Sequence, residues 1–218
     1  MKRLILIGLS AISLAACGNG GQEQVEADVE SSAVESVSSE SEAEDTSITP
    51  EKTNKAFVEL TDKIKPIEMG EFLGSDKAGG ATVDEVVEAL GDYTREQYSN
   101  EDDEGVIKSS YIWDFPRNQQ TLSAEFEDDS VVRFTYFSDR YKEMTAEGFE
   151  SIATDSTIDE NYLIENFGAP YYFGQVSSGS YLSTTYTYRA EDHTDDSAHQ
   201  YSIYLDDGVV TNKDEYVQ

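Results

Sequence analysis

The feature that most constrains the fold of this chain is a short pattern that occurs twice. Residues 125–134 read EFEDDSVVRF and residues 203–212 read IYLDDGVVTN, and both contain Asp-Asp, a small residue and Val-Val. Asp129 and Asp207 lie 78 positions apart. Gly91 and Gly168, each of which follows an apolar helical stripe, lie 77 positions apart. Two landmarks with nearly the same spacing indicate that one structural unit has been used twice.

The first copy begins with two predicted helices. Thr49 is suited to cap a helix that starts at Pro50, and Phe57, Leu60 and Ile64 recur at spacings of three and four. A Gly-rich loop leads to a second helix, where Thr82 and Glu85 form a capping-box pattern. Its buried stripe and its terminating glycine are Val83, Val86, Val87, Leu90 and Gly91.

Strands are predicted to follow the helices of the first copy. The segment SSYIWDF, residues 109–115, is rich in β-branched and aromatic residues. Two later segments alternate between apolar and polar residues, which predicts one buried face in each strand. Their inward residues are Leu122, Ala124 and Phe126 in one segment and Val132, Phe134 and Tyr136 in the other. Asp128, Asp129 and Ser130 form the predicted turn between them.

The second copy repeats the same order of elements. A short helix is predicted from Thr145, and TIDENYLIENFGAP predicts another helix that Thr157 caps and Gly168 ends. Tyr188 stands where the first copy has Trp113. The inward residues of the last hairpin are predicted to be Tyr201, Ile203 and Leu205.

These patterns predict an α+β fold made of two tandem copies of a helix-helix-antiparallel-sheet module. The helices are expected on one face of each sheet, and the other face is expected to be open. The predicted modules span residues 51–140 and 141–218.

The N-terminus has the layout of a bacterial lipoprotein signal. The basic start MKR is followed by an apolar run of about a dozen residues, which is too short to span a bilayer as a mature helix. The run ends in Leu14, Ala15, Ala16 and Cys17, which is the order of a lipobox. We therefore predict a signal peptide at 1–16, cleavage after Leu14–Ala15–Ala16, and diacylglyceryl and acyl chains (palmitate or similar) on Cys17, the single cysteine of the chain.

A strongly acidic segment follows the predicted lipidation site. Residues 18–50 contain nine acidic residues and no Lys, Arg or aromatic residue, so residues 17–50 are predicted to be a disordered tether. Setting these acids and the two basic N-terminal residues aside leaves 36 acidic and 13 basic residues in the rest of the chain. This imbalance excludes nucleic acid as an expected partner, because phosphate binding needs a basic patch.

The repeated unit resembles a known group of proteins. The segments GGATVDEVVEALGD, YIW and LSAEFEDDSVV are similar to those of the β-lactamase-inhibitor-protein-like (BLIP-like) modules and of the small lipoprotein of the outer-membrane β-barrel assembly machine. The loop DKAGGAT is most similar to tandem-module lipoproteins of Gram-positive bacteria. The resemblance implies two helices on one face of an antiparallel sheet and a lipid-anchored protein on the extracytoplasmic face of a membrane, on a Gram-positive cell surface.

Candidate sites for chemistry are few. His193 and His199 lie near Asp192, Asp195 and Asp196, a combination that could bind a divalent metal, although a solvated loop explains it as well. The acidic run at 100–105 could attract Ca²⁺ but lacks the alternating ligands of an EF-hand loop. No nucleophile motif, zinc-protease motif or phosphate loop occurs. The chain is therefore predicted to be no enzyme and to bind no metal or cofactor.

Aromatic residues on the open sheet face are the predicted binding residues. Phe137 and Tyr204 fall on the opposite phase from the inward triples, and Tyr171 and Tyr172 follow the helix stop at Gly168. The predicted function is binding of an envelope or secreted protein, or of a wall polymer, by a membrane-anchored lipoprotein. Two alternatives are an inhibitor of a secreted or host hydrolase and a cation-binding surface protein. An envelope hydrolase would need a catalytic cluster in a pocket.

Overall fold

The structure, a computed structural model, describes residues 49–72, 79–103, 105–154, 157–178, 181–192 and 198–217. These residues lie within one compact unit of the chain. The predicted signal peptide, its cleavage site Leu14–Ala15–Ala16, Cys17 and nearly all of the predicted tether fall outside the described residues.

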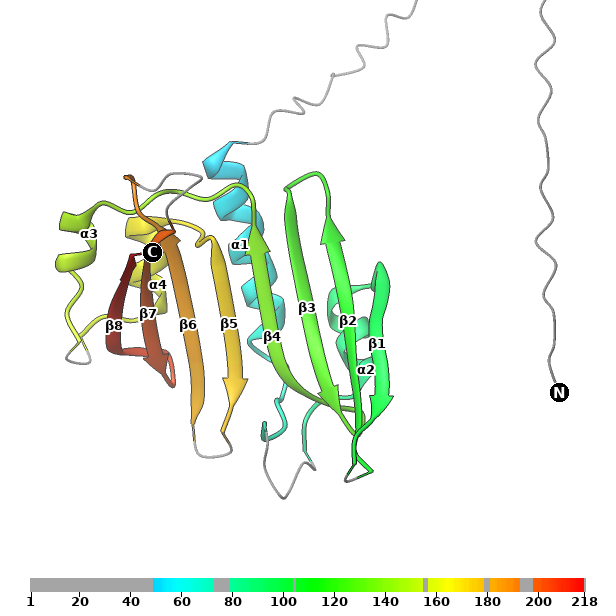
Figure 1. The fold of residues 1–218 in the computed structure, drawn as a ribbon. Helices are drawn as coiled ribbons and strands as arrows, with labels where there is room; N and C mark the ends of the chain where they lie inside the picture. The colour runs from blue at the N-terminus through cyan, green and yellow to red at the C-terminus, as the bar shows by residue number, and fades with distance from the viewer. Residues whose placement is uncertain are drawn as a thin grey trace, which may run out of the picture. The chain divides into compact units, whose positions relative to one another are not determined.

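The element order is helix, helix and four strands, and this order occurs twice (Figure 1). The elements of the first half are α1 (Pro50–Ile64), α2 (Val83–Leu90), β1 (Arg95–Glu101), β2 (Ile107–Phe115), β3 (Gln120–Glu127) and β4 (Ser130–Ser138). Those of the second half are α3 (Ala146–Glu150), α4 (Glu160–Phe167), β5 (Tyr172–Ser177), β6 (Leu182–Arg189), β7 (His199–Asp206) and β8 (Val209–Val217).

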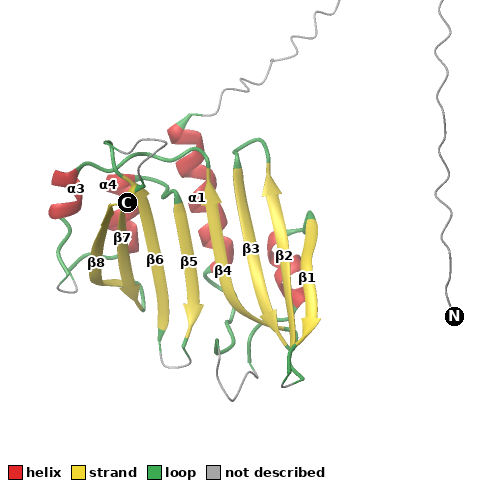
Figure 2. Ribbon diagram, in the orientation of Figure 1, coloured by secondary structure: helices red, strands yellow, loops and turns green. Residues whose placement is uncertain are grey.

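The predicted fold class of two tandem modules, each with its own sheet, is wrong. The eight strands form one antiparallel sheet in the order β1-β2-β3-β4-β5-β6-β7-β8, and the described fold is mostly β (Figure 2). The halves are joined where β4 pairs with β5, from Arg133 opposite Val176 to Phe137 opposite Tyr172. Two four-stranded sheets would each expose an unpaired backbone edge at this place, and pairing β4 with β5 satisfies both edges. The predicted module boundary at residue 140 lies in the connection from β4 to α3.

The helix ends follow the local sequence closely. Thr49 caps α1 with Pro50 in the first turn, Thr82 and Glu85 form the predicted capping box of α2, and Thr145 caps α3. The cap of α4 differs from the prediction, because Asp159 rather than Thr157 accepts a hydrogen bond, from the backbone N–H of Tyr162. A carboxylate at this position also interacts favourably with the positive end of the helix dipole.

The helices pack on one face of the sheet, which we call the helix face (Figure 1). The ring of Phe57 on α1 lies 4.9 Å from Tyr136 on β4, 5.8 Å from Phe173 on β5 and 6.2 Å from Tyr186 on β6. One helix therefore covers strands of both halves and closes a single core. No helix of the described residues lies on the opposite face in Figure 1, and we call that face the open face.

The two hairpins have the same turn geometry, but the structural alignment of their turn residues differs by one residue from the predicted one. Asp128 and Asp129 have φ angles of 49° and 67°, and Asp207 and Gly208 have φ angles of 49° and 80°. Two residues at positive φ between paired strands make a type I′ hairpin turn. Asp128 therefore corresponds to Asp207, and Ser130 begins β4 instead of completing the turn. Gly208 and Asp129 occupy the same position in the two turns, and both adopt a left-handed conformation. Glycine does so without a Cβ atom, whereas Asp129 carries a side chain.

The turn aspartates hold the neighbouring strand in place. Oδ1 of Asp128 accepts a hydrogen bond of 2.9 Å from the backbone N–H of Ile107 at the start of β2. Oδ1 of Asp207 accepts one of 2.9 Å from Leu182 at the start of β6. Both hairpins also have a register shift at the same distance from the turn. Asp128 and Asp207 are thus structural elements of the two hairpins, in agreement with the prediction of a turn at each place.

In each half, an aromatic side chain also donates a hydrogen bond to the carbonyl group of the glycine that ends a helix. Nε1 of Trp113 donates to the carbonyl of Gly91 over 2.8 Å, and the hydroxyl of Tyr188 donates to the carbonyl of Gly168 over 3.1 Å. Tyr188 therefore stands in the structural place of Trp113, as predicted. None of the helices in the described ranges is long and apolar enough to cross a membrane.

Candidate functional site

Three of the four predicted binding residues come together where the halves of the sheet meet. The ring of Phe137, at the end of β4, lies 5.1 Å from Tyr172 and 6.2 Å from Tyr171. Tyr141 extends the group, with its ring 5.4 Å from Tyr171. Arg189, at the end of β6, places its guanidinium 4.3 Å from the Tyr171 ring centre. We call these five residues the seam cluster.

Strand direction explains why these residues gather at one end of the sheet. Neighbouring strands of an antiparallel sheet run in opposite directions, so the end of β4, the start of β5 and the end of β6 lie at the same end of the sheet (Figure 1). Phe137 lies opposite Tyr172, and Tyr172 lies opposite Thr187 on β6. Phe137 is 44% exposed on the open face, so a partner that contacts this end of the sheet can reach its ring.

Gly174 leaves space for the side chain of Tyr172. A Cβ atom on Gly174 would lie 2.5 Å from the hydroxyl oxygen of Tyr172, so the Tyr172 side chain occupies the space above this residue. Burial raises the pKa of the Tyr172 hydroxyl, while the charge of Arg133 acts in the opposite direction. Tyr172 therefore stays neutral near pH 7 and presents a ring with a hydrogen-bonding end, as side chains at protein interfaces commonly do.

Tyr204, the fourth predicted residue, lies apart from the seam cluster. It is on the open face of β7, opposite Thr185 and Asn212. No ring contact joins it to Phe137, Tyr171 or Tyr172 in the described part of the chain. The alternation of side chains placed Tyr204 on the correct face, but it could not show which strands lie between two residues.

Sequence reasoning missed Tyr141 and Arg189. Side chains alternate along β6, so Arg189 points to the face opposite the inward residues Tyr186 and Tyr188. The same alternation that predicted Phe137 on the open face therefore predicts Arg189 there as well. Tyr141 follows the end of β4, where no periodic pattern indicates direction.

Small hydroxyl side chains form much of the open face around the seam cluster. They alternate with inward residues along the central strands and are Thr121, Ser123, Thr135, Ser183, Thr185, Thr187 and Ser202. Two arginines of the open face are paired with carboxylates on neighbouring strands. Arg95 lies 2.6 Å from Asp114, and Arg133 lies 3.5 Å from Glu125. The open face is thus rich in small polar groups.

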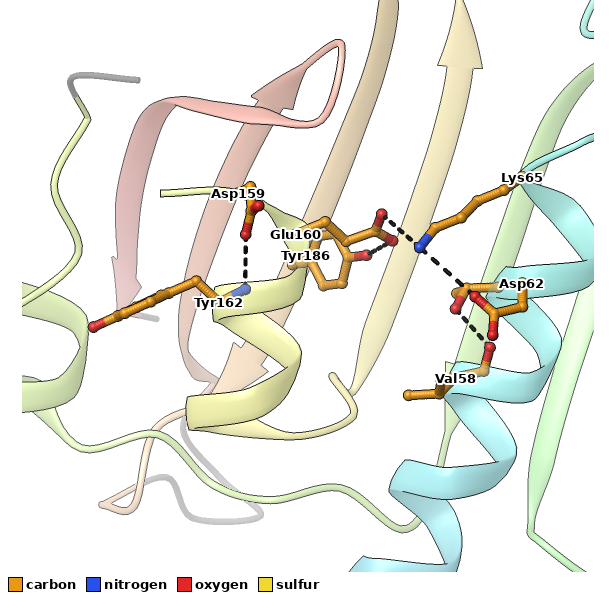
Figure 3. Close-up of polar contacts among 8 residues, drawn as sticks. Val58, Asp62, Lys65, Asp159, Glu160, Tyr162 and Tyr186 are labelled. Atoms are coloured by element: carbon orange, nitrogen blue, oxygen red, sulfur yellow. Dashed lines mark hydrogen bonds and ion pairs between the residues drawn. The ribbon is translucent and has the colours of Figure 1, made fainter. Parts of the chain in front are cut away.

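A second polar group lies on the helix face and joins the halves (Figure 3). The hydroxyl of Tyr186 on β6 donates to Glu160 in the first turn of α4. Lys65 at the end of α1 lies 3.2 Å from the other Glu160 oxygen and 3.8 Å from Asp62. Burial, with the charge of Glu160, raises the pKa of Tyr186 well above its usual value. Tyr186 therefore stays a hydrogen-bond donor, and the group connects α1, α4 and β6.

The predicted metal candidates do not form a metal site in the described residues. His199 places Nδ1 2.5 Å from Asp192 and Nε2 2.8 Å from Glu215, so both ring nitrogens are occupied by carboxylates. No group of three potential metal ligands was found within the described ranges. His193, Asp195 and Asp196 lie outside them.

The described residues of the acidic run at 100–105 are the end of β1 and part of the segment that follows it. Asp102 lies 3.1 Å from Lys108 and accepts a hydrogen bond from the backbone N–H of Val106. These contacts close the hairpin and engage the Asp102 carboxylate with protein groups. The alternative of a cation-binding surface protein gains no support from them.

The His199 contacts predict a pH-dependent stability. Only a protonated imidazole has two N–H groups to donate to two carboxylates. Desolvation lowers the pKa of His199, but hydrogen bonds to Glu215 and Asp192 and the attraction of their charges outweigh it, so the net pKa is raised. A raised folded-state pKa contributes stability that is fully present below about pH 6.5 and is lost as the pH rises through the folded value.

We therefore expect the free energy of unfolding of the wild type to fall, relative to His199→Gln, as the pH rises from about 6. Urea unfolding at a series of pH values measures this difference. A difference between wild type and His199→Gln that stays constant with pH would show that the imidazole is not charged in this place.

Comparisons with known proteins add one structural likeness. No protein-family model matches the sequence, and no curated protein matches it. The crystal structure of a "putative beta-lactamase inhibitor protein" from Streptococcus mutans aligns with a TM-score of 0.48 at 15% sequence identity, over 73% of this chain and 96% of that chain. Similarity at this level transfers neither a fold nor a function to this chain.

Proposed function

We propose that this protein is a membrane-anchored, extracytoplasmic binding protein without enzymatic activity, and that it holds a partner protein against the open face of its sheet. The observation that carries the proposal is the seam cluster, which gathers four aromatic rings and an arginine at one end of the sheet and exposes Phe137 on the open face. Tyrosine and arginine are among the residues that contribute most to binding energy at protein interfaces. A surrounding surface of small polar groups fits the polar rim of such a site.

Rigid support strengthens this proposal. Phe137 and Tyr172 are in paired strands, and Tyr172 occupies the space above Gly174. A binding group that is already ordered loses little conformational entropy when a partner arrives. A secreted or host hydrolase would be one class of partner for the same surface, and a wall polymer would be another.

The anchoring part of the proposal rests on the lipobox that ends at Cys17. Two or more acyl chains on this residue would hold the protein stably at a membrane, because each buried CH₂ contributes about 0.8 kcal/mol. We expect Cys17→Ala to abolish labelling by a palmitate analogue and to release the protein to the medium or leave it unprocessed. Labelling at the wild-type level in this variant would contradict lipidation at Cys17.

The binding part predicts a large effect of Phe137→Ala combined with Tyr172→Ala. Loss of two rings from the centre of an interface should weaken partner binding by at least about tenfold. The measurement is quantitative co-purification of envelope and secreted proteins with full-length wild type and with the double variant. Tyr216→Ala is the control, because Tyr216 is a similarly exposed ring on the outer strand β8. Recovery of the same proteins in the same amounts with wild type and double variant would refute the seam cluster as the binding site.

A further inference from the structure

Arg189 differs from the other arginines of the open face. Arg95 is paired with Asp114 and Arg133 with Glu125, each across neighbouring strands. Arg189 stacks on Tyr171, and its Nε atom is buried without a hydrogen-bond partner. No carboxylate of the described residues lies within ion-pair distance of its guanidinium.

An unpaired guanidinium is unexpected in a protein with this charge balance. Acidic residues outnumber basic ones by 45 to 15 in the whole chain, so carboxylates are abundant partners. The Nε–H group is buried without an acceptor, which is unfavourable, and its burial keeps an external group from reaching it. The terminal N–H groups of the same guanidinium are therefore the ones that an external group can contact.

We propose that Arg189 receives a carboxylate of the bound partner, from an acidic side chain or a chain terminus, that is adjacent to an apolar group. This inference rests on the proposed binding function and specifies the chemistry of the partner. Stacking on Tyr171 uses the flat face of the guanidinium and leaves N–H groups at its edge to donate to two carboxylate oxygens. The rings of Phe137 and Tyr141 form the apolar surroundings that contact the remainder of the partner residue.

A carboxylate fits this place better than a phosphate group. Arg189 supplies one positive charge, and the negative charges of Asp139 and Glu143 also act on Tyr141 in the seam cluster. A dianionic phosphate group would need further cations to balance its second charge. A single carboxylate is matched by a single guanidinium.

The test uses two small probes that differ only in charge. N-acetyl-L-phenylalanine carries a carboxylate beside an aromatic ring, and N-acetyl-L-phenylalaninamide carries a neutral amide in its place. Each probe is titrated into isotope-labelled full-length protein while the Nε–H resonance of Arg189 and the ring resonances of Tyr171 are followed by NMR. We expect saturable shifts with the acid and an affinity roughly tenfold lower for the amide, since a hydrogen bond to a charged group is lost.

Two variants assign this preference to one residue. Arg189→Gln should bind acid and amide equally, and Arg95→Gln should keep the preference for the acid because its guanidinium is already paired. Equal affinity of the wild type for the two probes, no saturable shift with the acid, or a preference that persists in Arg189→Gln would each overturn the inference. If the Phe137→Ala/Tyr172→Ala variant loses its partner while the probes bind equally, the proposed function stands and the role of Arg189 fails. If the acid is preferred while co-purification is unchanged in that variant, the proposed function fails instead.

Discussion

Phe57→Ala is expected to lower the free energy of unfolding by about 3–5 kcal/mol, the range for removal of a buried phenylalanine ring. Phe57 is fully buried, and its ring contacts Tyr136, Phe173 and Tyr186 on three adjacent strands. Alanine would leave a cavity below the place where β4 and β5 pair. Because these strands belong to different halves, the loss should weaken both halves together. Chemical denaturation followed by circular dichroism and fluorescence measures the effect.

Phe137→Ala is the matched control for this measurement. It removes the same ring from the open face, where Phe137 is 44% exposed, so its effect should be below about 1 kcal/mol. Wild type and Phe57→Ala should both unfold in one transition that the two probes report at the same denaturant concentration. A loss below about 1 kcal/mol in Phe57→Ala would contradict its central place in the core. Two separate transitions in the wild type would contradict a single core.

Gly80→Ala is expected to lower the free energy of unfolding by about 2–4 kcal/mol, from overpacking and from a weakened backbone hydrogen bond. A Cβ atom on Gly80 would lie 2.4 Å from the backbone nitrogen of Gly70 and 2.8 Å from the carbonyl oxygen of Val131. These two atoms form a hydrogen bond of 2.8 Å that fastens the segment after α1 to the start of β4. The neighbours are backbone atoms, which cannot rotate away as a side chain can.

Gly148→Ala is the control for the same change elsewhere. The atoms nearest to a Cβ on Gly148 are the ring of Phe167 and the hydroxyl of Thr145, both 3.1 Å away and both in side chains rather than in the backbone. Gly148 is also within α3, where alanine is favoured over glycine. Thermal unfolding should therefore show a much lower midpoint for Gly80→Ala than for Gly148→Ala. Equal midpoints in the two variants would show that the segment containing Gly80 adjusts without strain.

The local elements could be predicted from the sequence because their causes are local. The caps at Thr49, Thr82 and Thr145 depend on contacts within three or four residues, and the helix-ending glycines depend on their own φ angles. The cap of α4 was assigned to Thr157, two residues early, because Thr157 and Asp159 are both suitable capping residues. The hairpin alignment was one residue off, because the sequence does not show which residues of the Asp-Asp turn have positive φ.

The candidate site could be predicted only in part. Alternation along the strands placed Phe137 and Tyr204 on the open face, since successive side chains point to opposite faces. The distances between strands are not contained in that pattern. Tyr204 was therefore grouped with Phe137, whereas the residues that join Phe137 are Tyr171, Tyr172, Tyr141 and Arg189.

The sequence alone determined the pairs of helices in the two copies, the buried faces of β3 and β7 and of the end of β4, and the Asp-containing turns, because these follow from residues close together in the chain. Only the tertiary structure decided that the copies share one sheet and that the seam cluster exists. Both depend on the pairing of β4 with β5, from Arg133 opposite Val176 to Phe137 opposite Tyr172. Backbone hydrogen bonds between strands carry no side-chain identity, so the sequence does not show which strand edges pair.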